Sequence, residues 1–212
     1  MTYFEVLVEG TSDVPTLREV LQRKFGLVEG ENFRIHPHRG KGRLPENVNQ
    51  APALRHQGLL DQLPAKLKGF GRYLDASACV LVVIDADDTP CHELLEGLNR
   101  MLEQLPSKPA RVLFRVAIEE TESWFIADDA AVAKAFPKAK LAKLRQIQPD
   151  AVCGAWEVLA VALGFRLADV TGIDKTEWAR AIAPHLDLDH PRSPSLGKLL
   201  AGVQREMTRA CG

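Results

Sequence analysis

Apolar residues in the first part of the chain switch between the spacing of β-strands and that of α-helices. Strand-like runs occupy residues 3–9, 32–37, 78–84 and 111–118, and helical spacing occupies residues 14–25, 57–69 and 92–105. The run at 78–84 is apolar at every position, as is typical of a strand that helices cover on both faces of a parallel sheet. This order predicts an α/β fold, with a Rossmann-like core in which helices flank a mostly parallel sheet.

The remainder of the chain has only helical spacing. Helices are expected at residues 119–127, 130–136, 155–163, 175–185 and 195–207. We therefore divide the chain into an α/β core at residues 1–128 and a helical C-terminal region at residues 129–212 that packs on this core.

The composition fits one globular unit and leaves any nucleic-acid contact to a local patch. Of the 212 residues, 46% are hydrophobic, and the formal net charge of -1 argues against a general basic coat. The cysteines at positions 79, 91, 153 and 211 lack the CxxC spacing, which favours a reducing, cytoplasmic setting. No export signal is recognisable and no apolar run reaches 18 residues, so we expect no membrane span.

Acidic side chains end two of the predicted strands. Glu9 ends the first strand, and Asp85, Asp87 and Asp88 follow the third. Carboxylates about 4 Å apart repel one another by about 1 kcal/mol per pair in water and by about 4 kcal/mol in a partly buried site, whereas Mg²⁺ or Mn²⁺ would turn this repulsion into binding. Either set alone is equally well explained as a helix cap or a solvated turn, and the two together favour a metal site.

A third acidic set follows the fourth predicted strand. Glu119, Glu120 and Glu122 lie there, and if the helix begins at Glu119, Glu119 and Glu122 share one of its faces. Asp13, which opens the helix after Glu9, is either a further ligand or a simple N-cap. The helix dipole also favours acidic first turns. Capping does not explain why all three sets follow strands, so a shared cation is the more economical interpretation.

Basic residues gather in the long loop at residues 39–56. Arg39, Lys41 and Arg43 alternate with glycines, and positions 32–45 contain no acidic residue, a pattern typical of a phosphate contact or of a solvated loop. Lys175 lies at the start of a predicted helix, where the dipole disfavours a cation, so a carboxylate or substrate partner is expected.

In combination these motifs resemble the Toprim domain of topoisomerases, primases and OLD-family nucleases. The resemblance rests on the runs VEGTSD at residues 8–13 and IDAD at residues 84–87, which match a strand-end glutamate and a D-x-D pair. A closer resemblance is to an uncharacterised Toprim-like family, domain of unknown function 4276, and it extends to ETESW at residues 120–124, Lys175 and RSPS at residues 192–195. The implied fold is a Toprim-like core.

The resemblance also implies a divalent-metal site and a nuclease. The implied metal ligands are Glu9, Asp85 and Asp87, with Asp13, Glu120 and Glu122 as candidates for a second ion. Lys175 would neutralise charge that develops on phosphorus, and the metal would activate water. The expected activity is Mg²⁺- or Mn²⁺-dependent hydrolysis of nucleic acid, with DNA favoured over RNA, in phage defence or DNA repair.

Departures from the pattern limit this interpretation. Tyr3 and Tyr73 are the only tyrosines, and neither is recognisable as a topoisomerase nucleophile. OLD proteins carry an ATPase domain that this sequence lacks, so the analogy suggests a separate ATPase subunit as a partner, and a second copy of the chain is a further candidate.

Two other interpretations stay open. The run IDADDT at residues 84–89 also fits a phosphatase of the haloacid-dehalogenase type, with Asp85 as nucleophile and Asp87 as acid/base. That motif usually opens its domain, however, and Glu9 would have no role. The other interpretation is a non-catalytic module that binds nucleic acid or a partner ATPase.

Overall fold

The computed structural model describes residues 2–53, 55–87, 89–151 and 154–209. The strands in these ranges are β1 (Phe4–Val8), β2 (Phe33–Pro37), β3 (Cys79–Asp85) and β4 (Val112–Ala117). They form one sheet in the order β2-β1-β3-β4, and every pair is parallel. The predicted α/β fold with a Rossmann-like core is confirmed.

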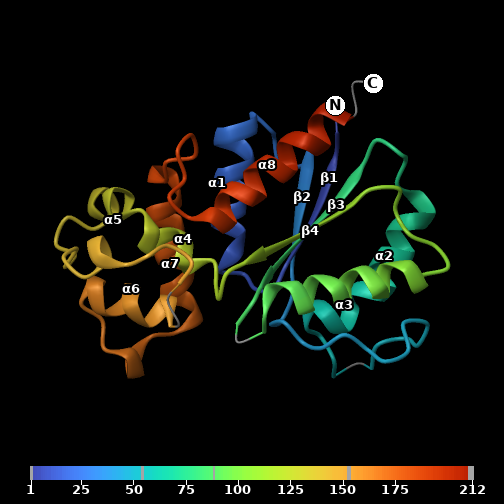
Figure 1. Cartoon of the computed structure of the whole chain (residues 1–212), viewed down its shortest axis with the longest axis horizontal. Coiled ribbons are helices and arrows are strands. Elements are labelled where there is room, and N and C mark those ends of the chain that lie inside the picture. The colour runs from blue at the N-terminus through green and yellow to red at the C-terminus, as the bar shows by residue number, and fades with distance from the viewer. Residues whose placement is uncertain (1, 54, 88, 152–153, 210–212) are drawn as a thin grey trace.

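Helices connect the strands and make up most of the C-terminal region (Figure 1). They are α1 (Asp13–Phe25), α2 (Leu59–Tyr73), α3 (Cys91–Gln104), α4 (Glu122–Ala127), α5 (Asp129–Ala135), α6 (Ala155–Leu163), α7 (Gly172–Ile182) and α8 (Pro194–Arg209). Each helix expected from the apolar spacing is present, with small shifts at the ends. None of the described helices is long and apolar enough to cross a membrane.

Alternate side chains of each strand enter two separate cores, because successive residues of a strand point to opposite faces. On one face Val6, Leu81 and Leu113 lie in register and pack towards α1, α8 and the C-terminal helices. On the other face Leu7 and Val82 pack towards α2 and α3. Figure 1 shows the same division, with α1 and α8 on one side of the sheet and α2 and α3 on the other.

The C-terminal helices α4 to α7 form a lobe beside the sheet, and α8 returns along β4 (Figure 1). Trp124 of α4 is fully buried, and its Nε1–H donates to Ser195 Oγ at the start of α8 over 2.9 Å. This bond holds α4 beside α8, and so fixes the segment that follows β4. Cys79 and Cys91 are free thiols, while positions 153 and 211 lie outside the described residues.

Candidate functional site

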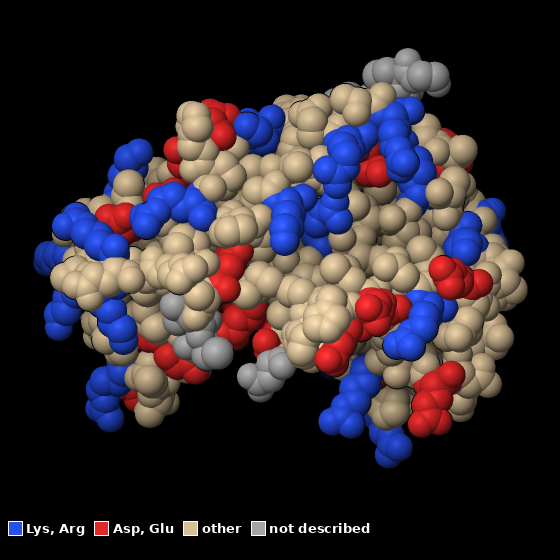
Figure 2. All heavy atoms as spheres, in the orientation of Figure 1, with Lys and Arg blue, Asp and Glu red and all other residues tan. Residues whose placement is uncertain are grey.

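Acidic side chains from three neighbouring strands gather at the carboxyl edge of the sheet. Glu9 follows β1, Asp85 ends β3, and Glu120 and Glu122 follow β4. Because β1, β3 and β4 are parallel neighbours, these ends share one edge. Figure 2 shows a group of Asp and Glu side chains in an indentation between the sheet half of the molecule and the helical lobe. Asp88 lies outside the described residues.

Glu9 and Asp85 are in direct contact. Glu9 Oε1 accepts a hydrogen bond from the Asp85 backbone N–H over 2.8 Å. Its own backbone carbonyl accepts from the Gly40 N–H over 2.9 Å, so the loop after β2 fixes the end of β1. The side chain of Glu9 is thereby directed to the end of the adjacent strand β3.

Asp13 has a structural role at the same edge. Its Oδ2 accepts from the Gly10 N–H over 2.9 Å, and its Oδ1 accepts from the Thr121 hydroxyl over 3.0 Å. Ser12, and not Asp13, is the N-cap residue of α1. Because both of its carboxylate oxygens accept hydrogen bonds, the buried Asp13 connects the turn after β1 to the start of α4. It is better placed to orient the site than to bind a metal directly.

Lys175 reaches the acidic edge from α7. Its Nζ lies 3.4 Å from Glu120 Oε1 and 3.8 Å from Glu122 Oε1, which supplies the carboxylate partner expected for a lysine at a helix start. The ammonium also lies 4.7 Å from the centre of the Trp156 ring, within cation–π range. The other oxygen of Glu120 accepts from the Trp156 N–H over 3.4 Å.

Asp87 lies at the exposed rim and is paired with a residue of the basic loop. Lys41 Nζ lies 2.9 Å from Asp87 Oδ2 and donates to the Ala86 carbonyl over 2.9 Å. Asp87 and Glu119 both have positive φ, 46° and 63°, and the Asp87 N–H donates to the Glu119 carbonyl over 3.1 Å. Such strained positions in non-glycine residues cluster at functional sites.

Burial and mutual repulsion raise the pKa of the acidic groups at this edge. Burial is the main cause of the high pKa of Asp85, and the charges of Asp13 and Glu9 add to it. Burial raises the pKa of Glu9 to about 8 and that of Glu120 to about 7. The pKa values of Asp13 and Glu122 are raised as well, again mainly by burial. The positive charges of Lys41 and Lys175 lower the pKa values of Glu9 and Glu120, respectively, but by less than burial raises them.

The donor atoms fit a hard divalent cation. They are carboxylate oxygens, which Mg²⁺ and Mn²⁺ prefer, and the Asp85 carboxylate accepts no hydrogen bond from a described residue. Within the described ranges, no three His, Cys, Asp or Glu side chains converge as a ready-made metal centre. Since Mg²⁺ usually keeps several waters and is held by one or two carboxylates, the edge suits a hydrated cation better than a closed cage.

Glu119 does not belong to this cluster, and the expectation that it shares a helix face with Glu122 was wrong. The helix begins at Glu122, because the positive φ of Glu119 places it in the preceding turn. Its carboxylate instead accepts from the backbone N–H groups of Gly154 and Ala155. Glu119 therefore caps the N-terminus of α6, whose first N–H groups lack partners inside the helix.

Replacing Glu119 by alanine is expected to lower stability by about 1 kcal/mol, the typical cost of losing a helix N-cap. For a chain of this size that corresponds to a fall in Tm of roughly 2–4 °C, measurable by circular dichroism. Glu103→Ala removes an exposed glutamate of α3 as the matched control. Equal Tm values for the two variants would contradict the capping role.

The basic loop is more ordered than its glycines suggest. The N–H groups of Leu59 and Leu60 donate to the carbonyls of Gly40 and Lys41 over 2.8 and 2.7 Å. Gly42, with φ of 68°, lies so close to α2 that a Cβ there would overlap the Asp61 carboxylate. The glycine thus serves close packing, and Lys41 points to Asp87 while Arg39 and Arg43 line shallow cavities on the outside of the loop.

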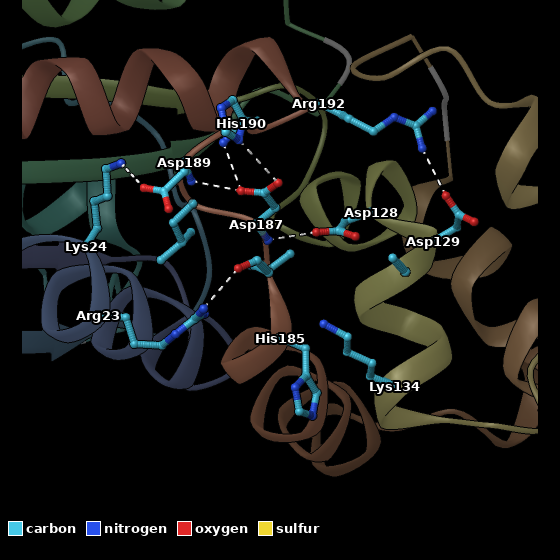
Figure 3. Close-up of a pocket in the computed structure, with 13 residues that line it drawn as sticks. Arg23, Lys24, Asp128, Asp129, Lys134, His185, Asp187, Asp189, His190 and Arg192 are labelled. Carbon is cyan, nitrogen blue, oxygen red and sulfur yellow. Dashed lines mark hydrogen bonds and ion pairs between the residues drawn. The ribbon is translucent and has the colours of Figure 1, made fainter.

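A cavity of about 530 Å³ lies elsewhere, near the C-terminal end of α1 (Figure 3). Its charged side chains pair with one another: Lys24 Nζ lies 2.7 Å from Asp189 Oδ1, and Arg192 Nη1 lies 3.0 Å from Asp129 Oδ1. The cavity lies apart from the acidic edge: Lys24 in its lining and Asp13 at the edge are at opposite ends of α1, roughly 16 Å apart at 1.5 Å per residue. We assign it no part in the chemistry.

Thr121 and Trp156 were not expected in the site. Thr121 bonds to Asp13, and Trp156 contacts Lys175 and Glu120. The position of Thr121 between two glutamates was a usable signal. Trp156 had no local signal, because only the packing of α6 against α4 brings it to the sheet edge.

The fold and the acidic edge define a Rossmann-like α/β protein whose acidic side chains gather at the carboxyl ends of its strands, the edge where open parallel sheets usually bind ligands. Residues 8–204 match the family described as Domain of unknown function (DUF4276), and the chain belongs to this family. The matched range includes every acidic residue of the site. No curated protein and no solved structure matches the chain.

Proposed function

We propose that this protein is a Mg²⁺- or Mn²⁺-dependent nuclease of the Toprim type that hydrolyses phosphodiester bonds, with DNA favoured over RNA. The observation that carries the proposal is the partly buried Asp85 carboxylate, whose pKa is raised by burial and by the charges of Asp13, Glu9, Glu122 and Glu120. A fold keeps such a repulsive cluster at a cost in stability. A bound cation is the simplest means of offsetting that cost.

In this proposal Glu9 and Asp85 hold the cation, and Glu120 and Glu122 hold or orient a second ion. Asp87, whose Oδ2 lies 2.9 Å from Lys41 Nζ, is the third ligand that the resemblance implies. A bound divalent ion would supply an activated water and stabilise the charge on the departing oxygen.

The protein groups around the cation site have separate tasks. Because the pKa of Glu9 is about 8, its carboxyl keeps its proton near neutral pH until a cation displaces it. Lys175, held by Glu120 and the Trp156 ring, would face the phosphoryl oxygens and neutralise negative charge there. Asp13 and Thr121 position the turn that carries Glu9.

The Toprim assignment itself is supported by the contact between Glu9 and Asp85. A strand-end glutamate beside a D-x-D pair is what the resemblance implies, and Glu9 Oε1 accepts from the Asp85 N–H over 2.8 Å. By the same analogy we propose a role in phage defence or DNA repair with a separate ATPase subunit.

The test compares Glu9→Gln and Asp85→Asn with the unaltered protein on plasmid DNA in the presence of Mn²⁺. Glu96→Gln, which removes an exposed carboxylate of α3, is the control. We expect both site variants to lose more than the roughly 10–100-fold that is typical of residues behind a metal ligand, and the control to retain full activity.

A phosphomonoester substrate separates the alternatives in the same assay. Hydrolysis that survives Glu9→Gln and disappears in Asp85→Asn would replace the nuclease with a haloacid-dehalogenase-type phosphatase. Mn²⁺ binding without turnover of DNA, RNA or phosphomonoester would instead leave a non-catalytic binding module.

A further inference from the structure

Three basic side chains line up where α8 packs over β4. Lys198 and Arg205 are exposed on α8, and seven residues apart they lie on one face of the helix, about 10 Å from each other. Arg115 of β4 lies between them. We call Lys198, Arg115 and Arg205 the α8 strip. Figure 2 shows Lys and Arg side chains gathered along this part of the surface.

Arg115 is held rigidly in the strip. Its Nε–H donates to the Lys198 carbonyl over 3.0 Å, and its Nη1–H donates to the Phe114 carbonyl over 2.6 Å. A Cβ at Gly202 would overlap the guanidinium, so the glycine lets Arg115 lie against the helix. Burial lowers the pKa of Arg115, and the charge of Arg205 lowers it further, which indicates that the two cations are close.

The protein neutralises the positive charge of the strip only in part, because the charge of Glu206 acts favourably on Arg115 alone. With the described residues, the side chains of Lys198 and Arg205 form no hydrogen bond or ion pair. The neighbouring Arg111 and Arg209 differ, because both pair with Glu206 over 2.8 and 3.2 Å. Lys198 and Arg205 are therefore the two cations of the strip that remain available to an external anion.

The strip begins near the acidic site. Ser195, three residues before Lys198 on α8, accepts from the Trp124 Nε1–H over 2.9 Å, and Trp124 follows Glu122 of the site by two residues. The charges of Lys198 and Lys41 also both lower the pKa of the Cys91 thiol, against the larger effect of burial, which agrees with this placement. Lys41 in turn contacts Asp87 at the rim of the site. Lys198 is therefore the end of the strip that lies towards the acidic site.

We propose that the α8 strip binds the phosphate backbone of the DNA whose phosphodiester bonds the acidic site cleaves. The proposal rests on the nuclease function. A row of separate cations matches a row of phosphates better than it matches one phosphate group, and in a chain of net charge -1 a local strip is needed to hold a polyanion beside carboxylates.

The test is fluorescence anisotropy of a labelled DNA duplex in EDTA, which removes cleavage from the measurement. Lys198→Gln with Arg205→Gln is compared with Lys138→Gln and Lys143→Gln, a pair of exposed lysines in the helical lobe that removes the same charge. Each lost phosphate contact lowers the salt slope by about 0.9 on a duplex. We expect the strip variant to bind the duplex at least about tenfold more weakly at low salt. The magnitude of its slope of log K against log[salt] should be smaller by about 1.8, and the control variant should bind as the unaltered protein does.

The outcomes separate the strip from the nuclease. Equal affinity and equal salt slope for the strip variant and the control would overturn the proposal that the strip binds DNA. Polyglutamate that competes as well as unlabelled duplex would overturn it too, since that result would indicate an acidic protein partner. If the duplex binds through the strip but the unaltered protein does not cleave DNA in Mn²⁺, the proposed nuclease function would be wrong and the proposed DNA-binding surface would stand. Unchanged melting of both variants shows that folding is intact.

Discussion

Asp85→Asn is expected to abolish Mn²⁺-dependent cleavage and, at the same time, to make the metal-free protein more stable. Burial and the charges of neighbouring acidic groups raise the pKa of Asp85, so its ionised form is unfavourable in the folded state. A neutral amide of the same shape removes this repulsion and also removes a ligand oxygen. We expect the free energy of unfolding of the metal-free variant to rise by about 1 kcal/mol or more at a pH of about 8. Each kcal/mol corresponds to an increase in Tm of roughly 2–4 °C.

Asp174→Asn is the control, because this same substitution is expected to lower stability where Asp85→Asn raises it. Hydrogen bonds from Thr171 hold the pKa of Asp174 below its usual range, so its charge is favourable in the folded state and the variant should melt at a lower temperature. Both variants are measured by thermal unfolding in EDTA and by plasmid cleavage in Mn²⁺. A loss of stability in Asp85→Asn, or retained cleavage, would contradict a strained metal ligand at this position.

Local spacing predicted the elements and the meeting of the acidic sets, because both depend on short-range patterns. The apolar run at 78–84 fixed the central strand, and parallel strands necessarily bring Glu9 and Asp85 to one edge. Glu119 and Glu120 could not be told apart in this way. The positive φ of Glu119 turns its carboxylate to α6, and nothing near it in the sequence indicates where α6 lies.

Long-range packing also decided the fate of the basic residues. Lys41, in a loop expected to contact phosphate or to be solvated, pairs with Asp87, 46 residues later, and its contact with phosphate stays a prediction. The α8 strip escaped the sequence interpretation because Arg115 and Lys198 become neighbours only when α8 packs on β4. Charge runs in a sequence identify loops, whereas charge built from separate elements requires the fold.

Mn²⁺ is expected to stabilise the protein more at a pH of about 8.5 than at about 6. Burial raises the pKa of Glu9 to about 8 and that of Glu120 to about 7, above the values near 4.3 of an unfolded chain. Between these limits the folded state binds more protons than the unfolded state, so these groups make the metal-free protein less stable as pH rises. The cation binds the deprotonated carboxylates, and above the folded pKa it has no proton to displace.

The measurement is Tm with and without Mn²⁺ at both pH values. A ligand at about 100 times its Kd adds about 2.7 kcal/mol, or several degrees for this chain, and we expect this increment at the higher pH and a smaller one at the lower. Asp85→Asn should lose most of it at both. Binding of a cation at unrelated surface carboxylates would depend neither on the titration of Glu9 nor on the presence of Asp85. Equal increases in Tm at the two pH values, or an undiminished increase in Asp85→Asn, would therefore indicate that the metal binds elsewhere.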